Sequence, residues 1–309
     1  MSIVVVGSSN TDLVVNVPDV PLEGETVLGN KFSTHKGGKG ANQAVAAARL
    51  GANVIFVSCI GKDDFGNKAV KSYQAEKINT NYIVREGESS GIALITVSDK
   101  GKNAISVSPE SNKLLSEKHI DAVGEVLENC EVVLVQLEVP LQTVEYLIKK
   151  CIKYDCKVIL NPAPALKLEQ NIYRYVDIII PNETEAEILT GIKVTDEESA
   201  KLAAKFLINK GVKNVIITLG SNGAYLYNQT HQELIPGFEV DPVDTTAAGD
   251  TFNGAIAYAI TQKKSIYDAV KFAHAASALA VTKHGAQSST PDYKAVVEFL
   301  KSYQLRAYS

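Results

Sequence analysis

The sequence predicts an α/β fold in which a mostly parallel central sheet is flanked by helices. Runs of apolar, β-branched residues recur along the chain, and amphipathic segments lie between most of them. Strands that are apolar on both faces suit a parallel sheet covered on both sides, and alternation with helices builds such a sheet through right-handed crossovers. The predicted strands are Ile3–Val6, Val54–Val57, Val132–Val135, Val158–Leu160, Val176–Ile180 and Val215–Thr218.

The helices expected between these strands share an amphipathic or alanine-rich pattern. They are predicted at Ala41–Leu50, Asp64–Ile78, Ser116–Leu127, Leu141–Tyr154 and Asp196–Asn209. After Gly249 the chain is mostly helical, with predicted helices at Asp250–Thr261, Ile266–Lys283 and Pro291–Tyr303.

Two stretches interrupt the alternation and resemble short antiparallel strands joined by turns. The strands predicted there are Leu13–Val17, Thr26–Leu28, Gly91–Ser98 and Asn103–Val107. No linker divides the remaining chain, so we expect one α/β domain over residues 1–309 with a discontinuous β lid. The lid is formed by about residues 12–34 and 90–109, and it is a candidate surface for a homodimer.

Composition excludes several classes of protein. The 309 residues are 45% hydrophobic and 21% charged, which argues against disorder. The net charge of −4 argues against a nucleic-acid partner, so any bound anion must be held by local groups. No apolar run approaches a membrane span or a signal segment. The four cysteines lack CxxC spacing and adjoin apolar residues, which predicts buried free thiols in a cytoplasmic protein.

The first candidate functional segment is residues 36–43, KGGKGANQ. Small residues before a helix let a ligand approach the backbone, and the helix N-terminus offers free N–H groups. A Walker A loop would need glycine where Ser33 stands and serine or threonine where Gly40 stands. The GxGxxG pattern is absent too, which weakens a dinucleotide-dependent oxidoreductase. A purely structural turn remains an alternative.

The second candidate segment is residues 244–254, DTTAAGDTFNG, which also leads into a helix. The backbone N–H groups of Ala247, Ala248 and Gly249 are a candidate anion hole. Asp250 beside them could accept a proton from an attacking hydroxyl while a phosphoryl group is transferred. The alternative is that Asp250 only caps the helix.

Both segments resemble the two signature motifs of the PfkB, or ribokinase-type, sugar kinase family. Further matching segments follow in order along essentially the whole chain: residues 7–12 (GSSNTD), 136–138 (QLE), 161–164 (NPAP), 182–185 (NETE), 218–220 (TLG) and 285–287 (GAQ). The resemblance implies a ribokinase-like three-layer fold with a small β-sheet lid.

The resemblance also implies the reaction, which is ATP-dependent phosphorylation of D-ribose at O5 with Asp250 as the base. Related kinases for deoxyribose, fructose or a nucleoside are alternatives. A sugar-binding protein without catalysis is less favoured, because Lys39, Glu185, Gly249 and Asp250 are all present.

The implied binding residues fall into two groups. The sugar would be held by Asn10, Asp12, Gly38, Lys39, Asn42, Glu138 and Asp250. The nucleotide would be held by Asn182, Thr218, Gly220, Ser221, Gly223, Gly249 and His274. From the residues alone, Asp12 could instead form a turn, and His274 could be a core residue of an apolar helix.

Two cations are implied as cofactors. Mg²⁺ would be held near ATP by Glu185, directly or through water. A monovalent cation, usually K⁺, would be held by Asp244, Thr246, Ala280, Lys283, Gly285 and Ser289, several of them through backbone carbonyls. The alternative interpretation of Asn182 and Glu185 is a helix capping box.

One segment departs from the family pattern. Residues 107–112 read VSPESN where the family often has glycine-alanine-asparagine, so Pro109, Glu110 and Ser111 stiffen and charge this stretch. The departure leaves the preferred pentose open and leaves the reaction class unchanged.

Overall fold

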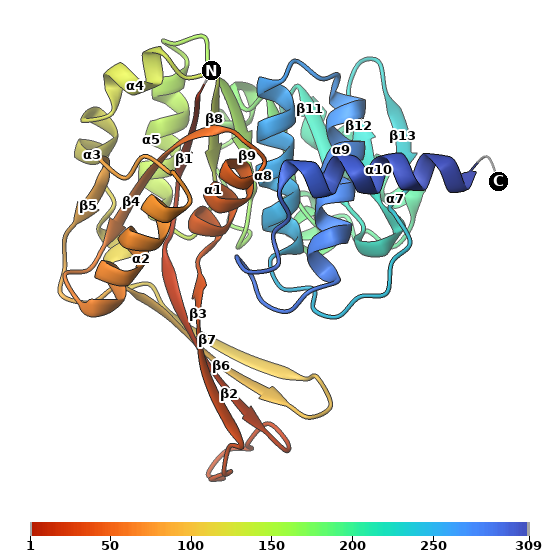
Figure 1. Cartoon of the computed structure of the whole chain (residues 1–309). Coiled ribbons are helices and arrows are strands. Elements are labelled where there is room, and N and C mark those ends of the chain that lie inside the picture. Colours follow the sequence, from red (N-terminus) through yellow and green to blue (C-terminus); the bar gives the residue numbers. More distant parts are fainter. Residues whose placement is uncertain (1, 308–309) are drawn as a thin grey trace.

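A computed structural model describes residues 2–307 and contains a large sheet and a small sheet (Figure 1). The large sheet consists of β1 (Ser2–Val6), β4 (Asn53–Ile60), β5 (Ile83–Arg85), β8 (Val132–Val135), β9 (Lys157–Leu160), β10 (Ile178–Ile179), β11 (Asn214–Thr218), β12 (Ala224–Tyr227) and β13 (Gln232–Ile235). Their order is β13-β12-β11-β10-β9-β8-β1-β4-β5. The strands from β11 to β5 pair in parallel, and β12 and β13 are antiparallel additions.

Helices cover both faces of the large sheet, which confirms the predicted three-layer fold. One face packs against α1 (Lys39–Arg49), α2 (Asp64–Ala75), α8 (Ala248–Thr261), α9 (Ile266–Val281) and α10 (Tyr293–Ala307). The other packs against α3 (Glu117–Asp121), α4 (Gly124–Glu128), α5 (Leu141–Cys151), α6 (Glu183–Thr190) and α7 (Glu197–Asn209). Within the described residues, no helix combines the length and the apolar character needed to cross a membrane.

The two-sided burial of β1 shows why its sequence is continuously apolar. Ile3 and Val5 belong to the core under α1 and α8, whereas Val4 and Val6 belong to the core under α5. All four side chains are at most 1% exposed. A strand between two helical layers has no solvent face, so it cannot alternate apolar with polar residues.

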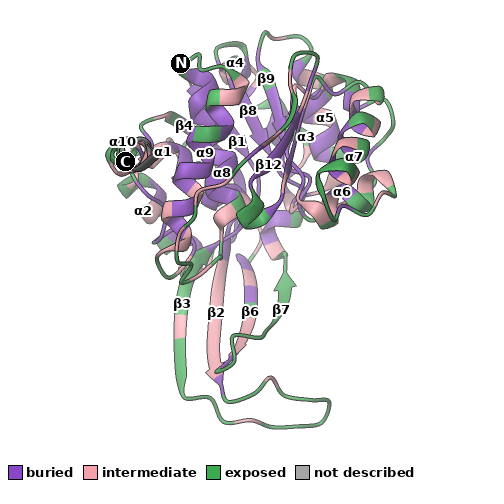
Figure 2. Ribbon diagram, turned by 90° about the vertical axis from the view of Figure 1, so that its right-hand side faces the viewer, coloured by how far each residue is buried: buried purple, intermediate pink, exposed green. Residues whose placement is uncertain are grey.

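The small sheet projects from the large domain and is more exposed (Figures 1 and 2). It contains β2 (Asn10–Val17), β3 (Lys31–Gly37), β6 (Gly91–Ser98) and β7 (Asn103–Ser108), in the order β3-β2-β6-β7. The pair β6/β7 is antiparallel as predicted, β2/β3 is an antiparallel pair with a strand that was not predicted, and the central pair β2/β6 is parallel. The parallel pair arises because β2 and β6 are not joined by a turn but by the α1–β5 region of the large domain.

The strand predicted at Thr26–Leu28 is wrong, because this segment is irregular and Leu28 is 87% exposed. The partner of β2 is instead β3, which begins at Lys31 and continues to Gly37, beyond the expected end of the first lid segment. Its polar sequence KFSTHKG hid it, since most of this edge strand is exposed and carries no apolar run.

Two further boundaries differ from expectation. The single helix predicted at Ser116–Leu127 is two short helices, because the backbone leaves the helical region at Val123 and Gly124 follows. Glycine weakens helices, so the backbone breaks near Gly124. The amphipathic residue pattern continues on both sides of this break, which is why the sequence predicts one helix. The strand predicted at Val176–Ile180 shortens to β10, and a 3₁₀ turn at Tyr173–Tyr175 leads into it.

The strand order places a crevice at the carboxyl edge of the large sheet. From β1 the large sheet continues to β4 on one side, whereas β8 lies on the other side. In open α/β sheets, such a switch point is where ligands bind. Asn10, Gln136 and Asn161 follow β1, β8 and β9 at this edge.

We predict that Gly254→Ala destabilises the protein by about 2 kcal/mol, since overpacking costs about 1–3 kcal/mol and alanine recovers part of this through helix propensity. Gly254 is buried in α8, and a Cβ atom there would lie 2.6 Å from the Cβ of Ala46 and 2.7 Å from the carbonyl oxygen of Gln43. Neither neighbour is the end of a flexible side chain. Urea unfolding measures the change.

The matched control is Gly124→Ala in α4, where a Cβ atom would meet only the Tyr154 hydroxyl at 3.9 Å. This control should leave stability unchanged or raise it by up to about 1 kcal/mol. Equal unfolding midpoints for the two variants would contradict the close approach of α1 and α8.

Candidate active site

The carboxylate of Asp250 lies where α1 packs against α8. Asn42 Nδ2 donates to Asp250 Oδ2 at 2.9 Å, and Gln43 Nε2 donates to Asp250 Oδ1 at 3.0 Å. Asp250 is only 8% exposed. Each carboxylate oxygen therefore has an amide donor from α1, and the group is held in one orientation.

A second layer of buried amides orients Gln43. Gln43 Nε2 also donates to Asn161 Oδ1 at 3.0 Å, while Gln136 Nε2 donates to Gln43 Oε1 at 2.6 Å. Gln43 and Gln136 are fully buried. Sequence reasoning did not assign a role to either glutamine. One signal in the sequence could have indicated a role for Gln43. It is a glutamine inside an alanine-rich helix, α1, whose residues 40–47 are all buried.

Glu138 and Lys39 bring opposite charges beside Asp250. Glu138 Oε2 accepts hydrogen bonds from Ser8 Oγ at 2.5 Å and from the backbone N–H of Lys39 at 3.0 Å. The negative charge of Asp250, together with those of Glu138 and Glu185, raises the pKa of Lys39 against the opposing effect of burial. Lys39 is therefore a cation surrounded by three carboxylates.

The turn before Lys39 needs glycine at position 38. Gly38 has a φ of +88°, and a Cβ atom there would lie 2.7 Å from the backbone nitrogen of Asn10. A side chain would push this turn away from the carboxyl end of β1. The close approach brings the start of α1 against the start of β2.

Asn10 and Asp12 enter the site from the small sheet. Asn112 Nδ2 donates to Asn10 Oδ1 at 2.7 Å, and Asn112 Oδ1 accepts from the backbone of Ser9 at 2.9 Å. Burial, and then the charges of Glu138 and Asp250, raise the pKa of Asp12 to about 6. Asp12 is thus charged at neutral pH and becomes protonated as the pH falls below about 6.

A cavity of about 840 Å³ opens from Asp12. One wall is the inner face of the small sheet, including Val14 and Ile95, and the opposite wall is formed by the segments around Thr246 and Gly285. The wall includes polar side chains such as Ser33 and His35 near Asp12 and is partly apolar farther out.

The departure at residues 109–111 lies where β7 leaves the small sheet. Glu110 has a φ of +41°, in the left-handed region that favours glycine, and Ser108 Oγ donates to its carboxylate at 2.5 Å. Asn112, two residues later, still makes the contact with Asn10 described above. The segment around Pro109–Ser111 therefore lies at the strand exit, and the asparagine that contacts Asn10 follows directly after it.

The residues predicted to form an anion hole lie at the N-terminus of α8. Ala247 has a φ of +58°, a strained conformation for a residue with a side chain, and the helix begins at Ala248. The Ala248 N–H donates to the Thr245 carbonyl at 3.2 Å, while Gly249 is exposed. This turn directs the positive end of the α8 dipole toward the cleft beside Asp250.

Asn182 and Glu185 form the capping box that the sequence left as an alternative. Asn182 Oδ1 accepts from the Glu185 N–H at 2.8 Å, and Glu185 Oε2 accepts from the Asn182 N–H at 2.9 Å. Burial raises the pKa of Glu185, although its backbone hydrogen bond and the charge of Lys39 act in the opposite direction. Glu185 thus caps α6 and also faces the charges of the site.

The other nucleotide candidates follow β11 at the same edge of the sheet. Thr218 pairs with Asn182 through an isolated bridge, and its N–H donates to the Pro181 carbonyl at 3.0 Å. Gly220 and Ser221 form an exposed 3₁₀ turn that ends at Gly223. The bridge therefore brings Thr218 beside the start of α6, and residues 220–223 follow it between β11 and β12.

His274 is a buried residue of α9. Burial agrees with the alternative that it is a core residue of an apolar helix. It is 7% exposed and packs edge-on against Phe252 with ring centroids 5.1 Å apart. Burial lowers the pKa of His274 to about 4, so the ring is neutral at physiological pH. Its Nε2 has no hydrogen-bond partner among the described residues.

The monovalent-cation candidates lie on two adjoining segments tied by Asp244. Its carboxylate accepts from the Thr246 N–H at 2.9 Å and from the Gly285 N–H at 2.8 Å. Burial acts to raise the pKa of Asp244, but these hydrogen bonds outweigh it and lower the pKa. The backbone of Lys283 turns back to the Ala280 carbonyl, and Ser289 Oγ donates to the Ala286 carbonyl.

The structure therefore places several of the sugar candidates near Asp250, and Asp244 joins the two segments that carry the cation candidates. In residues 2–307, histidine, cysteine and acidic side chains form no group of three or more that could hold a metal ion. The supporting residues without an assigned role in the sequence reasoning are Gln43, Asn112, Gln136, Asn161 and Gln287.

Comparison with known proteins explains this arrangement. The family model for pfkB family carbohydrate kinases matches residues 1–293. The chain belongs to the pfkB family of carbohydrate kinases.

Several pfkB relatives align over nearly the full chain. It is 44% identical over 301 residues to a ribokinase from Haemophilus influenzae, covering 97% of this chain and 98% of that protein. It is 39% identical over 302 residues to a deoxyribokinase from Salmonella typhi, covering 97% and 99%. A structure of Arabidopsis thaliana ribokinase complexed with ribose and ATP matches with a TM-score of 0.89 and 34% identity, covering 97% of this chain and 98% of that one.

We predict that the carboxyl group of Asp12 titrates with a midpoint of about 6 in the ligand-free protein. Asp250→Asn removes one of the negative charges that raise this pKa, so the midpoint should fall. Carboxyl ¹³C NMR, with Asp12→Asn to assign the resonance, measures both values. Asp155→Asn, an exposed substitution away from the site, is the control. A wild-type midpoint near the ordinary value of about 4 would contradict the described burial.

Proposed function

We propose that this protein transfers the γ-phosphoryl group of ATP to O5 of D-ribose, giving D-ribose 5-phosphate and ADP. The ribokinase relatives and the matched structure with ribose and ATP support this reaction. The observation that carries it is the buried Asp250 carboxylate, held by two amides at the start of a helix and next to a polar pocket.

Asp250 is the base in this proposal. Its carboxylate accepts the proton of the O5 hydroxyl as that oxygen forms a bond to the γ-phosphorus, and the bond from phosphorus to the ADP oxygen breaks. The backbone N–H groups of Ala247, Ala248 and Gly249 and the α8 dipole stabilise charge on the phosphoryl oxygens. Because Asn42 and Gln43 hold both carboxylate oxygens, Asp250 is oriented before substrate arrives.

The ribose hydroxyls bind to the groups around the inner end of the cavity. Asn10 and Asn42 supply amide donors and acceptors, while Asp12 and Glu138 supply carboxylate acceptors. Vicinal hydroxyls offer both donors and acceptors, so this mixture suits a pentose. Gly38 and the backbone of Lys39 form the floor between them.

In this proposal ATP binds along the start of α6 and residues 218–223. The nucleoside end of ATP contacts Thr218, Gly220, Ser221 and Gly223, and the phosphates contact Gly249. His274 lies toward the adenine, and its Nε2, which has no partner among the described residues, can pair with an adenine ring nitrogen. Lys39 lies between the three carboxylates and supplies local positive charge for the phosphates. A chain with a net charge of −4 can thus bind a polyanion.

The residues present fit a magnesium ion held mainly by ATP. Glu185 uses Oε2 to cap α6, and its other oxygen is not part of that bond. Carboxylate oxygen and water are the ligands that Mg²⁺ prefers. We therefore assign Glu185, directly or through water, to Mg²⁺, which when bound neutralises charge on the ATP phosphates.

The two segments joined by Asp244 fit a monovalent cation. Turns at Thr246, Lys283 and Gly285 concentrate backbone carbonyls there, and oxygen ligands suit K⁺. We assign the cation to Asp244, Thr246, Ala280, Lys283, Gly285 and Ser289. Bound K⁺ would rigidify the turn that precedes the anion hole. The four buried, unpaired cysteines agree with a cytoplasmic location.

We also propose a homodimer through the small sheet. Its outer face, opposite the cavity, carries Leu13, Val15, Phe32 and Leu94 in adjacent register positions. Phe32 is 65% exposed and Leu94 is 57% exposed. A clustered apolar face on a projecting sheet is a typical protein–protein interface, and the same face of a second chain matches it.

We predict that Asp250→Ala lowers kcat by about 100- to 10,000-fold, because the proton acceptor is lost. Ribose binding, measured by calorimetry, should remain detectable, since Asn10, Asp12 and Glu138 are unchanged. A coupled ADP-release assay measures kcat. Retention of most of the turnover would remove the base assignment.

The same assay over a panel of ribose, 2-deoxyribose, fructose and nucleosides tests the substrate. Ribose should give the highest kcat/KM. Preference for 2-deoxyribose would favour the function of the deoxyribokinase relative, and no ADP release with any sugar would overturn the kinase proposal.

For the dimer, we predict that Phe32→Lys converts the protein to a monomer, because a charge at the centre of an apolar interface opposes association. Sedimentation velocity measures the mass. The control is Leu202→Lys, at a 50% exposed position of α7 far from the small sheet. A monomeric wild-type protein, or a variant that stays dimeric, would contradict the interface.

A further inference from the structure

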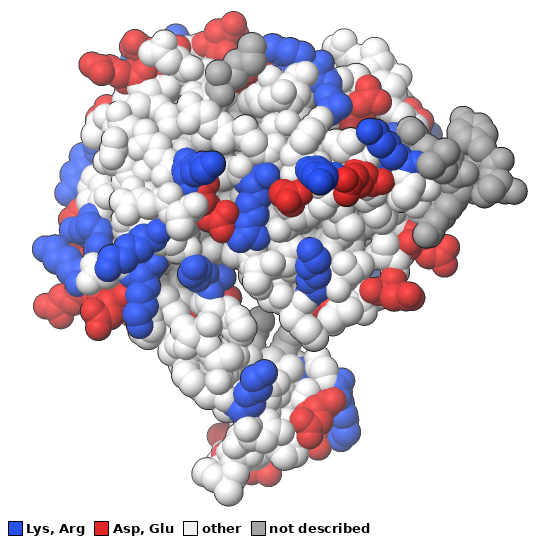
Figure 3. All heavy atoms as spheres, in the orientation of Figure 1, with Lys and Arg blue, Asp and Glu red and all other residues white. Residues whose placement is uncertain are grey.

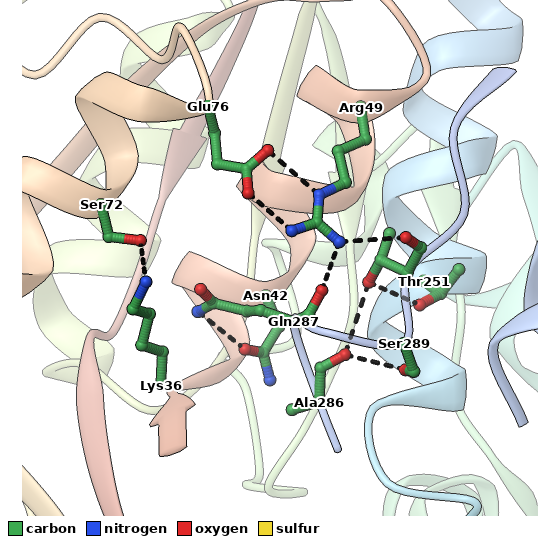
Figure 4. A network of polar contacts seen from close by, with 10 residues as sticks. Lys36, Asn42, Arg49, Ser72, Glu76, Thr251, Ala286, Gln287 and Ser289 are labelled. Carbon is green, nitrogen blue, oxygen red and sulfur yellow. Dashed lines mark hydrogen bonds and ion pairs between the residues drawn. The ribbon is translucent and has the colours of Figure 1, made fainter. Parts of the chain in front are cut away.

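Arg49, the last residue of α1, joins three segments that are distant in the sequence (Figure 4). Its Nε and Nη2 donate to the two carboxylate oxygens of Glu76 at 3.0 and 2.6 Å. Its Nη1 donates to the backbone carbonyls of Gln287 at 2.5 Å and Thr290 at 3.0 Å. The side chain is only 25% exposed, so these are well-shielded, charge-assisted contacts.

The segment that Arg49 holds leads directly to the proposed base. Gln287 Nε2 donates to Asn42 Oδ1 at 3.1 Å, and Asn42 Nδ2 donates to Asp250 Oδ2 at 2.9 Å. Gln287 is 6% exposed and also contacts the hydroxyl of the fully buried Tyr73. A continuous line of hydrogen bonds therefore runs from Arg49 through Gln287 and Asn42 to Asp250, and Figure 4 shows its first members.

The same segment also carries part of the proposed cation site. Ser289 lies between the two carbonyls that Arg49 binds, and Gly285 precedes them by two residues. Thr290 Oγ1 lies 3.5 Å from Thr251 Oγ1 of α8. Arg49 thus anchors residues 286–290 at the point where they lie against both α1 and α8.

We propose that Arg49 is a positioning residue of the phosphoryl-transfer site. It keeps residues 286–290 in place, so that Gln287 orients Asn42 against Asp250 and Ser289 stays in the cation site. Arg49 itself touches neither substrate. This inference rests on the proposed roles of Asp250 and of the cation segments.

The geometry requires a guanidinium group. Nε and Nη2 each donate to Glu76, while the two hydrogens of Nη1 are donated to two carbonyls, and the planar guanidinium holds these directions together. A lysine ammonium is a single point and cannot span both sets of partners. Glu76 compensates the charge and fixes the plane, so its loss should weaken the anchor less than the loss of Arg49.

The test compares Arg49→Ala, Arg49→Lys and Glu76→Gln with the control Arg85→Ala. Arg85 is a half-buried arginine that likewise donates to a carbonyl, that of Gly61, but on β5 at the far end of the sheet. For each variant, circular dichroism and thermal unfolding report the fold. Steady-state kinetics report kcat, the KM values for ribose and ATP, and the K⁺ concentration that gives half-maximal activation.

We expect folded Arg49→Ala to lose about tenfold to a hundredfold in kcat, since small displacements of a catalytic group have effects of this size. Half-activation should require about tenfold more K⁺, while the KM for ATP stays within about twofold of wild type. Arg49→Lys and Glu76→Gln should lie between wild type and Arg49→Ala. Added methylguanidinium should restore part of kcat in Arg49→Ala and leave Asp250→Ala unaffected.

The proposal is overturned if folded Arg49→Ala keeps kcat within about twofold of wild type, or if Arg85→Ala loses as much. If Arg49→Ala does not fold, a wild-type kcat in folded Arg49→Lys and Glu76→Gln overturns it. If the activity of the wild-type enzyme does not depend on K⁺, only the cation assignment is refuted. The kcat of Arg49→Ala would then still test whether Arg49 positions the site. Full activity in Asp250→Ala would refute the base assignment. The shift in the K⁺ concentration needed for half-activation of Arg49→Ala would then test the role of Arg49.

Discussion

The contact between α1 and α8 is the constraint on which the site depends. Asp250 on α8 is buried beside the Asn42 and Gln43 amides of α1, and an isolated carboxylate at this depth would be costly. The helices approach closely because small residues meet there, with Gly254 against Ala46. Any change that separates the helices removes both amide donors from the buried carboxylate, so packing and the orientation of Asp250 are one property of this interface.

Charge density is the second feature of the site. Glu138, Glu185 and Asp250 are three acids that surround Lys39 and raise its pKa, and Glu138 and Asp250 also raise the pKa of the neighbouring Asp12. Before substrate binds, Lys39 is the main compensating charge. When ATP binds with its metal ion, a polyanion and a cation enter the same volume. The charges of the carboxylates and of Lys39 are therefore better balanced in that complex than in the free protein.

Much of the architecture could be predicted from local sequence, and the reasons are physical. The strands of the parallel sheet are apolar on both faces, so β1 and β8 stand out along the chain. β3 could not be recognised, because an exposed edge strand of polar residues has no apolar pattern. The amide network around Gln43 could not be predicted either, because its partners Asn161 and Asp250 are 118 and 207 positions away and only the fold brings them together.

The small sheet has a mechanical consequence that follows from where its strands begin and end. Asn10 pairs with both Gly37 and Gly91, so β2, β3 and β6 are all anchored at one point beside the pocket. The eight residues of β2 extend about 26 Å from that point at about 3.3 Å per residue. The sheet can therefore act as a lever that pivots at Asn10, beside the pocket. A rotation of about 10° at Asn10 moves its far end by about 5 Å over that length. A force applied at the far end exerts a torque at Asn10 equal to the force multiplied by the length of the arm.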